Sequence, residues 1–570
     1  MDYKISYQNT HKHFIDIEFL IECITEDVIQ LQLPAWRPGR YELSNYSRNI
    51  QKFAITALDN TPLLFKKIKK ETWEVATNGL TSIKVNYNYY VAQPDAGGSW
   101  LDDDLLYINF INCLIYVLGR EYEECKIKLE IPNHYQIACG LDKTGSLLIA
   151  KDYYAVADSP MLASPSLKHK SYEVNGYTFN VWLYGDCQPD WNIILENFKK
   201  FTQEQLDMMS DFPEKDYHFL FQILPQKMHH GVEHRNSTSI ILGPADHINT
   251  KAFLNELFSI SCHELYHAWN IIKIRPVEMM PYDLTKENYF QTGFVAEGIT
   301  TYYGEFLLTR AGVLSEEEYF TELNGTLKKY FENYGRYNLS VADSSFDLWV
   351  DGYVPGIPNR KVSIYVKGAL IALIFDIEIR RGTRNAKSLD DVMIYLYNEF
   401  AKKGRGYSID DIRIAFETIA NASFKELYEE LVFGISPIEN RLESAFNYLG
   451  CELEITDAKT SVERTWGLKL TNKDGKVIVD YTEPDSPADK VLAKDDELIA
   501  IDGIKINGNL NDSVGEKKQL TVNLFRRNKL LTITLIADDK TYLKNYKIAK
   551  RKNVSEQQKE NFQKWIKKPF

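Results

Sequence analysis

Hydrophobic and polar residues alternate along the first 170 residues of the chain. The clearest segments are HFIDIEFLIECI (13–24), DVIQLQLPAW (27–36), SIKVNYNYYVA (82–92) and CKIKLEIP (125–132), with Asn, Asp, Gly and Pro residues between them. This period of two predicts β-strands that bury one face and are separated by turns. We therefore expect residues 1–170 to form a β-rich N-terminal domain.

The hydrophobic period changes to that of a helix near residue 190. The segment 191–209 (WNIILENFKKFTQEQLDMM) has helical spacing, and a longer helical pattern over 251–274 stops before Pro276. Together these patterns predict a mainly helical domain over residues 171–450. Further helices are predicted at about 292–310, 315–332, 363–382, 388–402 and 409–433.

Short strand patterns return near residue 455, among them KVIVDYT (476–482) and LTITLI (531–536). They predict a small β-rich domain over 455–540. The last segment, 541–570, carries nine Lys and Arg residues against two Glu. A charge run of this kind is typical of a solvated face or a frayed terminus, so we expect a basic C-terminal tail.

The length and net charge of the chain indicate how many domains it has and which kinds of partner it can bind. A chain of 570 residues is long enough for three to four domains. Asp and Glu number 79 against 67 Lys and Arg, which gives a net charge of −12. Nucleic-acid binding needs clustered positive charge, so we expect no nucleic-acid partner.

The cysteine pattern and the N-terminal sequence indicate the cellular compartment in which the protein is expected. The seven Cys residues are scattered without a C-x-x-C pair, which favours reduced thiols over a disulfide framework. The first twenty residues lack the apolar stretch of a signal peptide, and no apolar run reaches the ~18 residues of a membrane helix. We therefore expect a cytoplasmic protein without a membrane segment.

The string His263-Glu264-Leu265-Tyr266-His267 reads H-E-x-x-H. Residues four apart share one face of a helix, so both imidazoles can reach one metal ion. Glu264 and His267 lie in an apolar stripe, where an ionised carboxylate is costly unless a partner compensates it. A zinc ion with its water would do so. The alternative is a pair of hydrogen-bonded core histidines.

A third ligand is needed, because zinc hydrolases hold the metal with three protein ligands. Glu297 lies between apolar residues in a second helical segment, 293–308, and a carboxylate there fits a His₂Glu site; otherwise it is a surface residue. Glu264 is then placed to act as general base. Tyr365 opens a long apolar helix and is a candidate oxyanion donor, although taken alone it reads as an ordinary core tyrosine.

Five sequence motifs follow one another along the chain: LPAWRPGRY (33–41), HGVEHRNST (230–238), HELYHAWNIIKIRP (263–276), AEGITTYYGE (296–305) and YVKG (365–368). In this order they resemble the glycyl aminopeptidase family of PDZ-bearing zinc metallopeptidases. That family belongs to the gluzincin group, with thermolysin and aminopeptidase N. The resemblance covers nearly the whole chain.

The resemblance implies one zinc ion per chain at His263, His267 and Glu297, with Glu264 as general base. It also implies that Tyr365 stabilises the transition state. Glu233, on an edge strand with Gly231 and Val232, would bind the free α-amine of a peptide; a purely structural role for Glu233 stays open. The implied substrates are peptides that begin with Gly or Ala.

One departure concerns the edge strand. The family usually carries two glycines before this segment, whereas this chain has His230-Gly231. Because glycine allows close approach of the backbone to a ligand, His230 would narrow the cleft or add a polar group. The departure affects the substrate preference more than the reaction.

The C-terminal region resembles a PDZ domain in two places: TWGLKL (465–470), which matches a carboxylate-binding loop, and 483–503. Gly467 and Leu468 would then bind the C-terminal carboxylate of a peptide ligand through backbone N–H groups. The stretch after Gly508 is short for the helix that walls such a groove. Peptide binding and a structural role are equally open.

These observations predict a multidomain α+β protein. Its parts are a β-rich N-terminal domain, a thermolysin-like, mainly helical catalytic domain and a C-terminal PDZ-like domain. The predicted function is that of a zinc aminopeptidase acting on peptides. Two alternatives remain: a zinc endopeptidase, and a PDZ-based peptide-binding protein with an inactive peptidase body.

Overall fold

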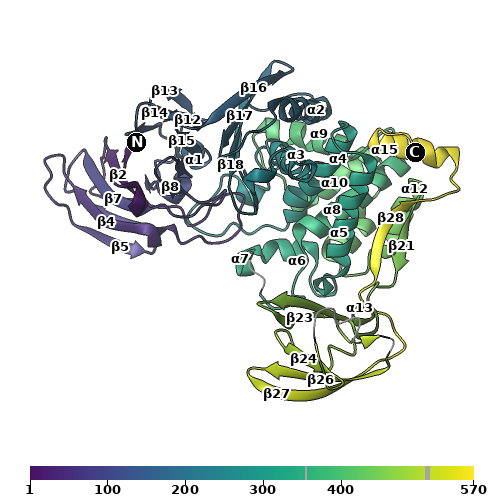
Figure 1. The fold of residues 1–570 in the computed structure, drawn as a ribbon. Coiled ribbons are helices and arrows are strands. Elements are labelled where there is room, and N and C mark those ends of the chain that lie inside the picture. Colours follow the sequence, from purple (N-terminus) through teal and green to yellow (C-terminus); the bar gives the residue numbers. More distant parts are fainter. Residues whose placement is uncertain (354–355, 507–513, 516) are drawn as a thin grey trace.

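The computed structural model describes residues 1–353, 356–506, 514–515 and 517–570. Figure 1 shows a β-rich N-terminal part on one side, a helical middle part, and a second β-rich part below the helices. The predicted β-rich N-terminal region and helical middle are confirmed. The predicted helix over 251–274 is shorter, because it ends at Tyr266 and the chain turns through residues 267–274.

The N-terminal part is built from three antiparallel or mixed sheets. In the largest sheet the order is β13-β14-β11-β1-β2-β7-β4. Every second residue of β2, from Ile15 to Ile21, is buried, which is the alternation seen in the sequence. The strands are β1 (Asp2–Ser6), β2 (Phe14–Ile21), β4 (Ile50–Thr56), β7 (Ile83–Tyr90), β11 (Cys125–Leu129), β13 (Asp142–Thr144) and β14 (Leu147–Ala150).

Two smaller sheets and one short helix complete this part, and the turns between them carry the segment 33–42 toward the helices. One sheet has the order β10-β3-β6-β5, with β10 (Tyr116–Val117), β3 (Val28–Gln32), β6 (Thr72–Ala76) and β5 (Phe65–Lys69). The other is β12-β15-β9-β8, with β12 (Gln136–Cys139), β15 (Met161–Ser164), β9 (Leu106–Ile108) and β8 (Trp100–Leu101); the helix is α1 (Tyr153–Ala157).

A five-stranded mixed sheet begins the middle part. Its order is β16-β17-β18-β20-β19, in which β17, β18 and β20 are parallel and β19 is an antiparallel edge strand. Helices α2 and α3 pack beside it and beside each other. The strands are β16 (Lys168–Val174), β17 (Tyr177–Tyr184), β18 (Asp216–Ile223), β19 (Met228–Glu233) and β20 (Ser237–Gly243).

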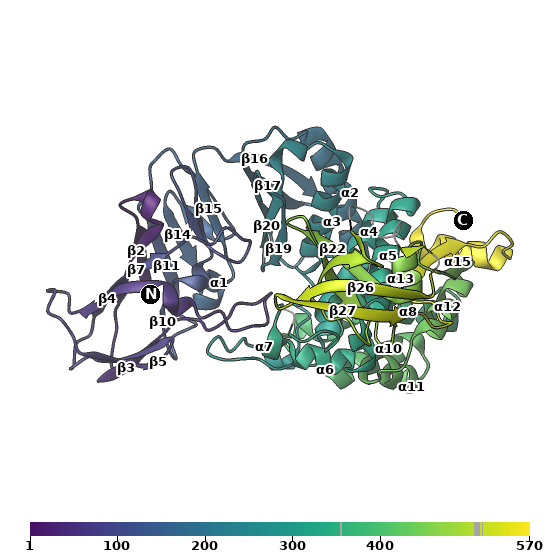
Figure 2. The same ribbon diagram turned by 60° about the horizontal axis from the view of Figure 1, so that its bottom comes forward.

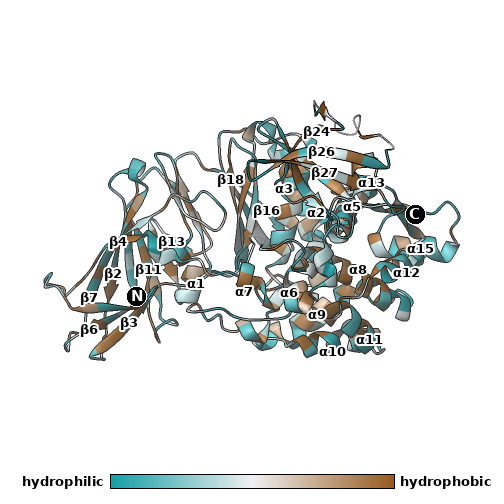
Figure 3. Cartoon of the chain, turned by 90° about the horizontal axis from the view of Figure 1, so that it is seen from below, coloured by the Kyte–Doolittle hydropathy of each residue, from teal (hydrophilic) through white to brown (hydrophobic). Residues whose placement is uncertain are grey.

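The helices form the rest of the middle part around α8, whose ribbon is coloured largely hydrophobic in Figure 3. The predicted helix over 409–433 is interrupted, because Asn421 adopts a left-handed conformation and caps α10. The helices are α2 (Trp191–Met209), α3 (Lys251–Tyr266), α4 (Thr300–Arg310), α5 (Glu316–Phe331), α6 (Val341–Phe346), α7 (Leu348–Asp351), α8 (Ile364–Gly382), α9 (Leu389–Glu399), α10 (Ile409–Ala420), α11 (Lys425–Tyr428) and α12 (Glu439–Tyr448), with π-helical segments η6 (Phe294–Ile299) and η9 (Glu429–Phe433).

The second β-rich part follows the short helix α13 (Ser461–Trp466), and Figure 2 turns its sheet to the front. Its sheet has a hydrophobic core of its own, built around Trp466, Val479 and Leu524. Its identification as PDZ-like stays a prediction. The strands are β22 (Leu468–Lys473), β23 (Lys476–Thr482), β24 (Glu497–Ile501), β25 (Ile504–Lys505), β26 (Gln519–Arg526) and β27 (Lys529–Ile536).

The basic C-terminal segment, expected to be a solvated face or a frayed terminus, is folded. Strand β28 (Asn545–Lys550) pairs with β21 (Cys451–Thr456), and helix α15 (Glu556–Ile566) packs back onto the helical part. The basic run hides an apolar stripe, since Phe562, Trp565 and Ile566 recur at helical spacing and are fully buried. The Trp565 indole donates a hydrogen bond of 3.0 Å to the Tyr302 hydroxyl.

Within the part of the chain that the structure describes, no helix is both long enough and apolar enough to span a membrane.

Candidate active site

The two histidines of the H-E-x-x-H string lie at the C-terminal end of α3. His263 is in the last turn and His267 is the C-cap residue. Their Nε2 atoms are 3.1 Å apart, and the Nδ1 atom of His267 faces the carbonyl oxygen of Asn270 at 3.2 Å. A hydrogen bond from Nδ1 to that carbonyl leaves Nε2 of His267 as the atom that can bind a metal ion.

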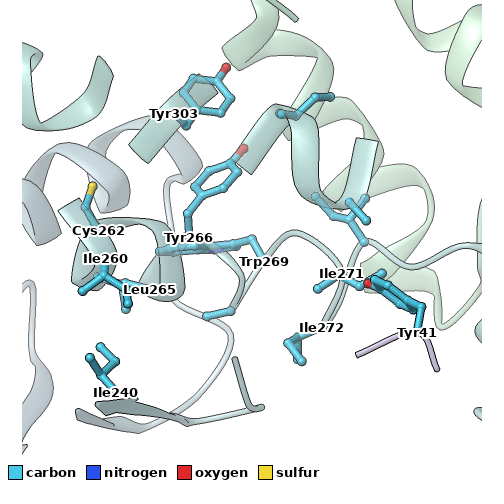
Figure 4. Packing of buried hydrophobic residues seen from close by; sticks show 14 of the residues in the cluster. Tyr41, Ile240, Ile260, Cys262, Leu265, Tyr266, Trp269, Ile271, Ile272 and Tyr303 are labelled. Carbon is cyan, nitrogen blue, oxygen red and sulfur yellow. The ribbon is translucent and has the colours of Figure 1, made fainter. Parts of the chain in front are cut away.

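Aromatic packing beneath α3 holds it against α4. The rings of Tyr266 and Tyr303 lie 4.9 Å apart, and Figure 4 shows them side by side with Trp269 and Leu265 in the same buried layer. Because this layer consists of large buried side chains, it fixes the position of the last turn of α3. The two imidazoles are thus presented from a rigid support.

Glu297 comes from η6, the π-helical segment that leads into α4. Its Oε2 atom is 3.5 Å from Nε2 of His267. The Asn270 side chain donates hydrogen bonds to the carbonyl oxygens of Val295 (2.8 Å) and Ala296 (3.1 Å), and so ties the end of α3 to this segment. Such π-helical turns are frequent at functional sites.

The donor atoms fit a zinc ion. Ligand atoms of His263, His267 and Glu297 all lie within 4.8 Å of one another. Two imidazole nitrogens and one carboxylate match the His₂Glu set of zinc hydrolases. The Oε2 atom of Glu264, buried beside them, has no hydrogen-bond partner, as expected of a group that faces an ion and its water.

The electrostatics of the site also favour a cation. Three buried carboxylates, those of Glu233, Glu264 and Glu297, gather around His267. Burial disfavours the charged form of the His267 imidazole, but these carboxylates outweigh it and raise its pKa to about 10. Burial raises the pKa of Glu264 well above its ordinary value and lowers that of His263 well below. A divalent ion would neutralise this excess of negative charge.

The edge strand β19 brings Glu233 to the same place. Atoms of Glu233, Glu264 and His267 lie within 4.8 Å of one another, and burial raises the pKa of the Glu233 carboxyl. Gly231 lies directly over Glu264, and a side-chain carbon there would overlap the Glu264 carboxylate. Val232 points away, into a small core with Ala96 and Ile241. Only its backbone can contact a ligand in the cleft.

Tyr365 lies in the first turn of α8, and its hydroxyl is 3.3 Å from that of Tyr353. Burial, together with the nearby Glu297, raises the pKa of Tyr365, so the hydroxyl stays protonated at neutral pH. α8 crosses η6 closely, since a Cβ at Gly298 would lie 2.5 Å from Cα of Gly368. This crossing brings Tyr365 near Glu297.

A segment of the N-terminal part, residues 37–42, reaches into the site. The Tyr41 hydroxyl donates a hydrogen bond of 3.2 Å to Oε1 of Glu297, although the two residues are 256 positions apart. A Cβ at Gly39 would lie 2.6 Å from Oε2 of Glu233. Sequence reasoning gave no role to Tyr41, Tyr353 or Asn270; only the occurrence of Tyr41 and Asn270 inside family-like motifs pointed to them.

The predicted peptide-binding residues Gly467 and Leu468 lie in the C-terminal β-rich part. Gly467 caps α13, and its N–H already donates to the carbonyl of Glu463 at 3.0 Å. Leu468 is buried and pairs with Thr482 in the sheet. Binding of a C-terminal carboxylate by these two residues stays a prediction.

Two family models match the chain. Residues 2–165 match the peptidase M61 N-terminal domain, and residues 256–371 match M61 glycyl aminopeptidase. Neither match extends into the C-terminal β-rich part.

Solved structures resemble it as well. The crystal structure of an aminopeptidase N family protein from Idiomarina loihiensis is 25% identical, with 99% of each chain covered and a TM-score of 0.91. An M1 zinc metallopeptidase from Deinococcus radiodurans is 12% identical over 76% of this chain and 94% of its own, with a TM-score of 0.46. Yeast LTA4 hydrolase is 12% identical, with 79% of this chain and 70% of its own chain covered and a TM-score of 0.45. No curated protein sequence matches significantly.

Proposed function

The chain is a metallopeptidase that carries both domains of the M61 glycyl aminopeptidase family, and from this premise we propose that it is a zinc-dependent aminopeptidase. Its proposed reaction is hydrolysis of the first peptide bond of peptides that begin with Gly or Ala. The observation that carries the proposal is the convergence of His263, His267 and Glu297 beside the unpartnered oxygen of Glu264.

The three convergent residues would hold one zinc ion per chain. Zinc bound there would act as a Lewis acid toward the scissile carbonyl and make a water nucleophilic near neutral pH. Glu264 is the general base: it accepts a proton from the attacking water and passes that proton to the leaving amine.

Tyr365 is the proposed oxyanion donor. Its hydroxyl is protonated at neutral pH, and its backbone lies in the first turn of α8, which Ser363 caps and which crosses η6 closely. A fixed donor stabilises charge that develops on the carbonyl oxygen without reorganisation at the moment of reaction.

Glu233 is the proposed partner of the substrate's α-ammonium group. The Glu233 carboxylate is buried, and within the described ranges no Lys or Arg forms an ion pair with it. Such a carboxylate is suited to bind a cation. The backbone at Gly39 lies directly against the Glu233 carboxylate, and the neighbouring Tyr41 donates a hydrogen bond to Glu297. A polypeptide therefore has little room to continue past Glu233, which favours an aminopeptidase over an endopeptidase.

The test combines metal content with hydrolysis of anilides of Gly, Ala and Leu and of their N-acetyl forms. We expect about one zinc per chain, release of aniline from free Gly and Ala anilides, loss of release on chelation, and slower release from Leu. Acetylation should reduce kcat/KM at least 100-fold. Equal cleavage of the acetylated forms would establish the endopeptidase alternative instead, and zinc without any cleavage would favour a binding role.

A further inference from the structure

A polar cavity of about 220 Å³ is lined by residues of the N-terminal part. Its wall includes Arg37, Arg40, Arg48, Glu42 and Asp95. Three of these residues belong to the segment 37–42, whose Gly39 and Tyr41 contact Glu233 and Glu297. The cavity is thus attached to the proposed substrate site by the same stretch of backbone.

The acidic groups of the cavity are already engaged. Glu42 pairs with Arg40. Asp95 accepts hydrogen bonds from the Gln93 side chain and from the N–H of Gly97, the latter at 2.9 Å, and its Oδ1 is 3.9 Å from Nδ1 of His230. The wall thus carries three guanidinium groups against two carboxylates, a net charge of +1.

Of the three arginines, only Arg37 is buried. It is 97% buried, since only 3% of its surface is exposed. Its Nη1 donates to the carbonyl oxygen of Pro38 at 3.1 Å, and within the described ranges no carboxylate lies within ion-pair distance of its guanidinium. Gly97 packs directly on the guanidinium, so that a side-chain carbon there would overlap it. The group is held rigidly.

A buried guanidinium without a directly paired carboxylate keeps donors available, and its planar fork of donors matches a carboxylate. The cavity therefore has the chemistry of a carboxylate-binding site. Burial and the charge of Arg37 lower the pKa of His230 to about 4, against the charge of Asp95, which raises it.

The distance along β19 fits a short peptide. Asp95 and Arg37 adjoin His230, three residues from Glu233 on the same strand. Three residues of a strand span about 10 Å, which is about the length of an extended tripeptide. A peptide with its amine at Glu233 can therefore place its other end beside Arg37.

We propose that the cavity around Arg37 binds the C-terminal carboxylate of the substrate, so that the enzyme acts preferentially on di- and tripeptides. The inference rests on the proposed aminopeptidase function. It names the substrate class of the same site, namely short peptides with two free ends. The shared chemistry, a peptide carboxylate, could also come from an acidic side chain.

The experiment compares kcat/KM for Ala-Ala-Ala, its C-terminal amide, and the amide of Ala-Ala-Asp. For the intact enzyme we expect the free acid to exceed its amide by at least 10-fold, and the Asp-containing amide to resemble the plain amide. Equal kcat/KM for acid and amide would overturn the proposal while leaving the aminopeptidase intact. A preference for the Asp-containing amide equal to that for the free acid would overturn the assignment to the C-terminus. Failure to cleave any of the three would instead count against the proposed function.

Variants of Arg37 test whether this residue causes the preference for the free acid. In Arg37→Met we expect the ratio of kcat/KM for the acid to that for the amide to fall below about 3. In Arg37→Lys we expect a smaller fall, because an ammonium group supplies the charge without the planar pair of donors of a guanidinium. Arg120→Gln is the matched control: this guanidinium also belongs to the N-terminal part but pairs with Glu123 outside the cavity, and the ratio should stay unchanged. An undiminished ratio in folded Arg37→Met would refute the role of Arg37. If Arg37→Met does not fold, the same ratio in Arg37→Lys decides.

Discussion

The site consists of two halves with different origins. One half comes from the helical part: His263, Glu264 and His267 at the end of α3, Glu297 on η6 and Tyr365 on α8. The other half comes from segments that flank these helices. They are residues 37–42, the edge strand β19 and Tyr353, which follows α7.

The helical half holds the groups of the proposed chemistry, and helices with buried aromatic support position them. The flanking half holds the groups that would recognise the ends of a substrate, and it relies on irregular backbone braced by contacts such as Gly39 on Glu233 and Gly352 on Glu42. Because the two halves come from different parts of the chain, substitutions in the helical half should change the chemical step and substitutions in the flanking half should change substrate selection.

The largest effect is expected in the helical half, for Glu264→Gln. The amide has the shape of the carboxyl but cannot accept the proton of the attacking water, so kcat should fall by roughly 10²–10⁴. Zinc content should stay at the wild-type level, because Glu264 is not a proposed ligand. Metal analysis beside steady-state kinetics checks both, and wild-type kcat with full zinc content would refute the mechanism.

Tyr365→Phe and Tyr353→Phe form a matched pair across the boundary between the halves. Removing the Tyr365 hydroxyl should lower kcat by roughly 10² with little change in KM, since the oxyanion donor is lost. Removing the Tyr353 hydroxyl should lower kcat only about 10-fold, because it acts by orienting Tyr365 at 3.3 Å. A larger loss in Tyr353→Phe than in Tyr365→Phe would reverse the two roles.

Part of the geometry of the helical half follows from local spacing. His263 and His267 are one helical turn apart and so share a face. Glu297 comes from the separate segment η6, which the Asn270 side chain ties to the end of α3. The family matches confirm the predicted resemblance and the predicted metallopeptidase. The roles of the individual residues stay proposals that the variants above test.

The flanking half could not be predicted in the same way. Tyr41 and Glu297 are 256 positions apart, and no periodicity connects a turn of the N-terminal part with a helix of the middle part. Arg37, Tyr353 and Asn270 are single residues without a spacing pattern. The C-terminal helix was missed for another reason: nine basic residues masked the stripe of Phe562, Trp565 and Ile566.

Tyr41→Phe tests the direct link between the halves. The variant keeps the ring that packs against Phe290 but loses the hydrogen bond to Oε1 of Glu297. Partners that orient a metal-binding side chain typically contribute 10–100-fold, so we expect zinc to bind about 10-fold more weakly. Competition with a chelator measures this affinity. Unchanged affinity would mean that the helical half holds the metal without help from the N-terminal part.

The smallest effect concerns His230, in the flanking half. Burial and Arg37 hold its pKa at about 4, below the ordinary 6.5. A lowered pKa contributes stability that is fully present above pH 6.5 and is lost as the pH falls from 6.5 to 4. After allowance for partial exposure, the loss between pH 7 and pH 5 is about 1 kcal/mol.

His230→Gln removes this titration and should reduce the fall in Tm between pH 7 and pH 5 by about 1–2 °C. The exposed His134 supplies the control. In His134→Gln, the fall in Tm should equal that of the wild type, as measured by calorimetry of the metal-free proteins. If His230→Gln loses as much stability in acid as the wild type, the charge of Arg37 does not act on the edge strand. The cavity would then be separate from the cleft, and the two halves would be coupled through Tyr41 alone.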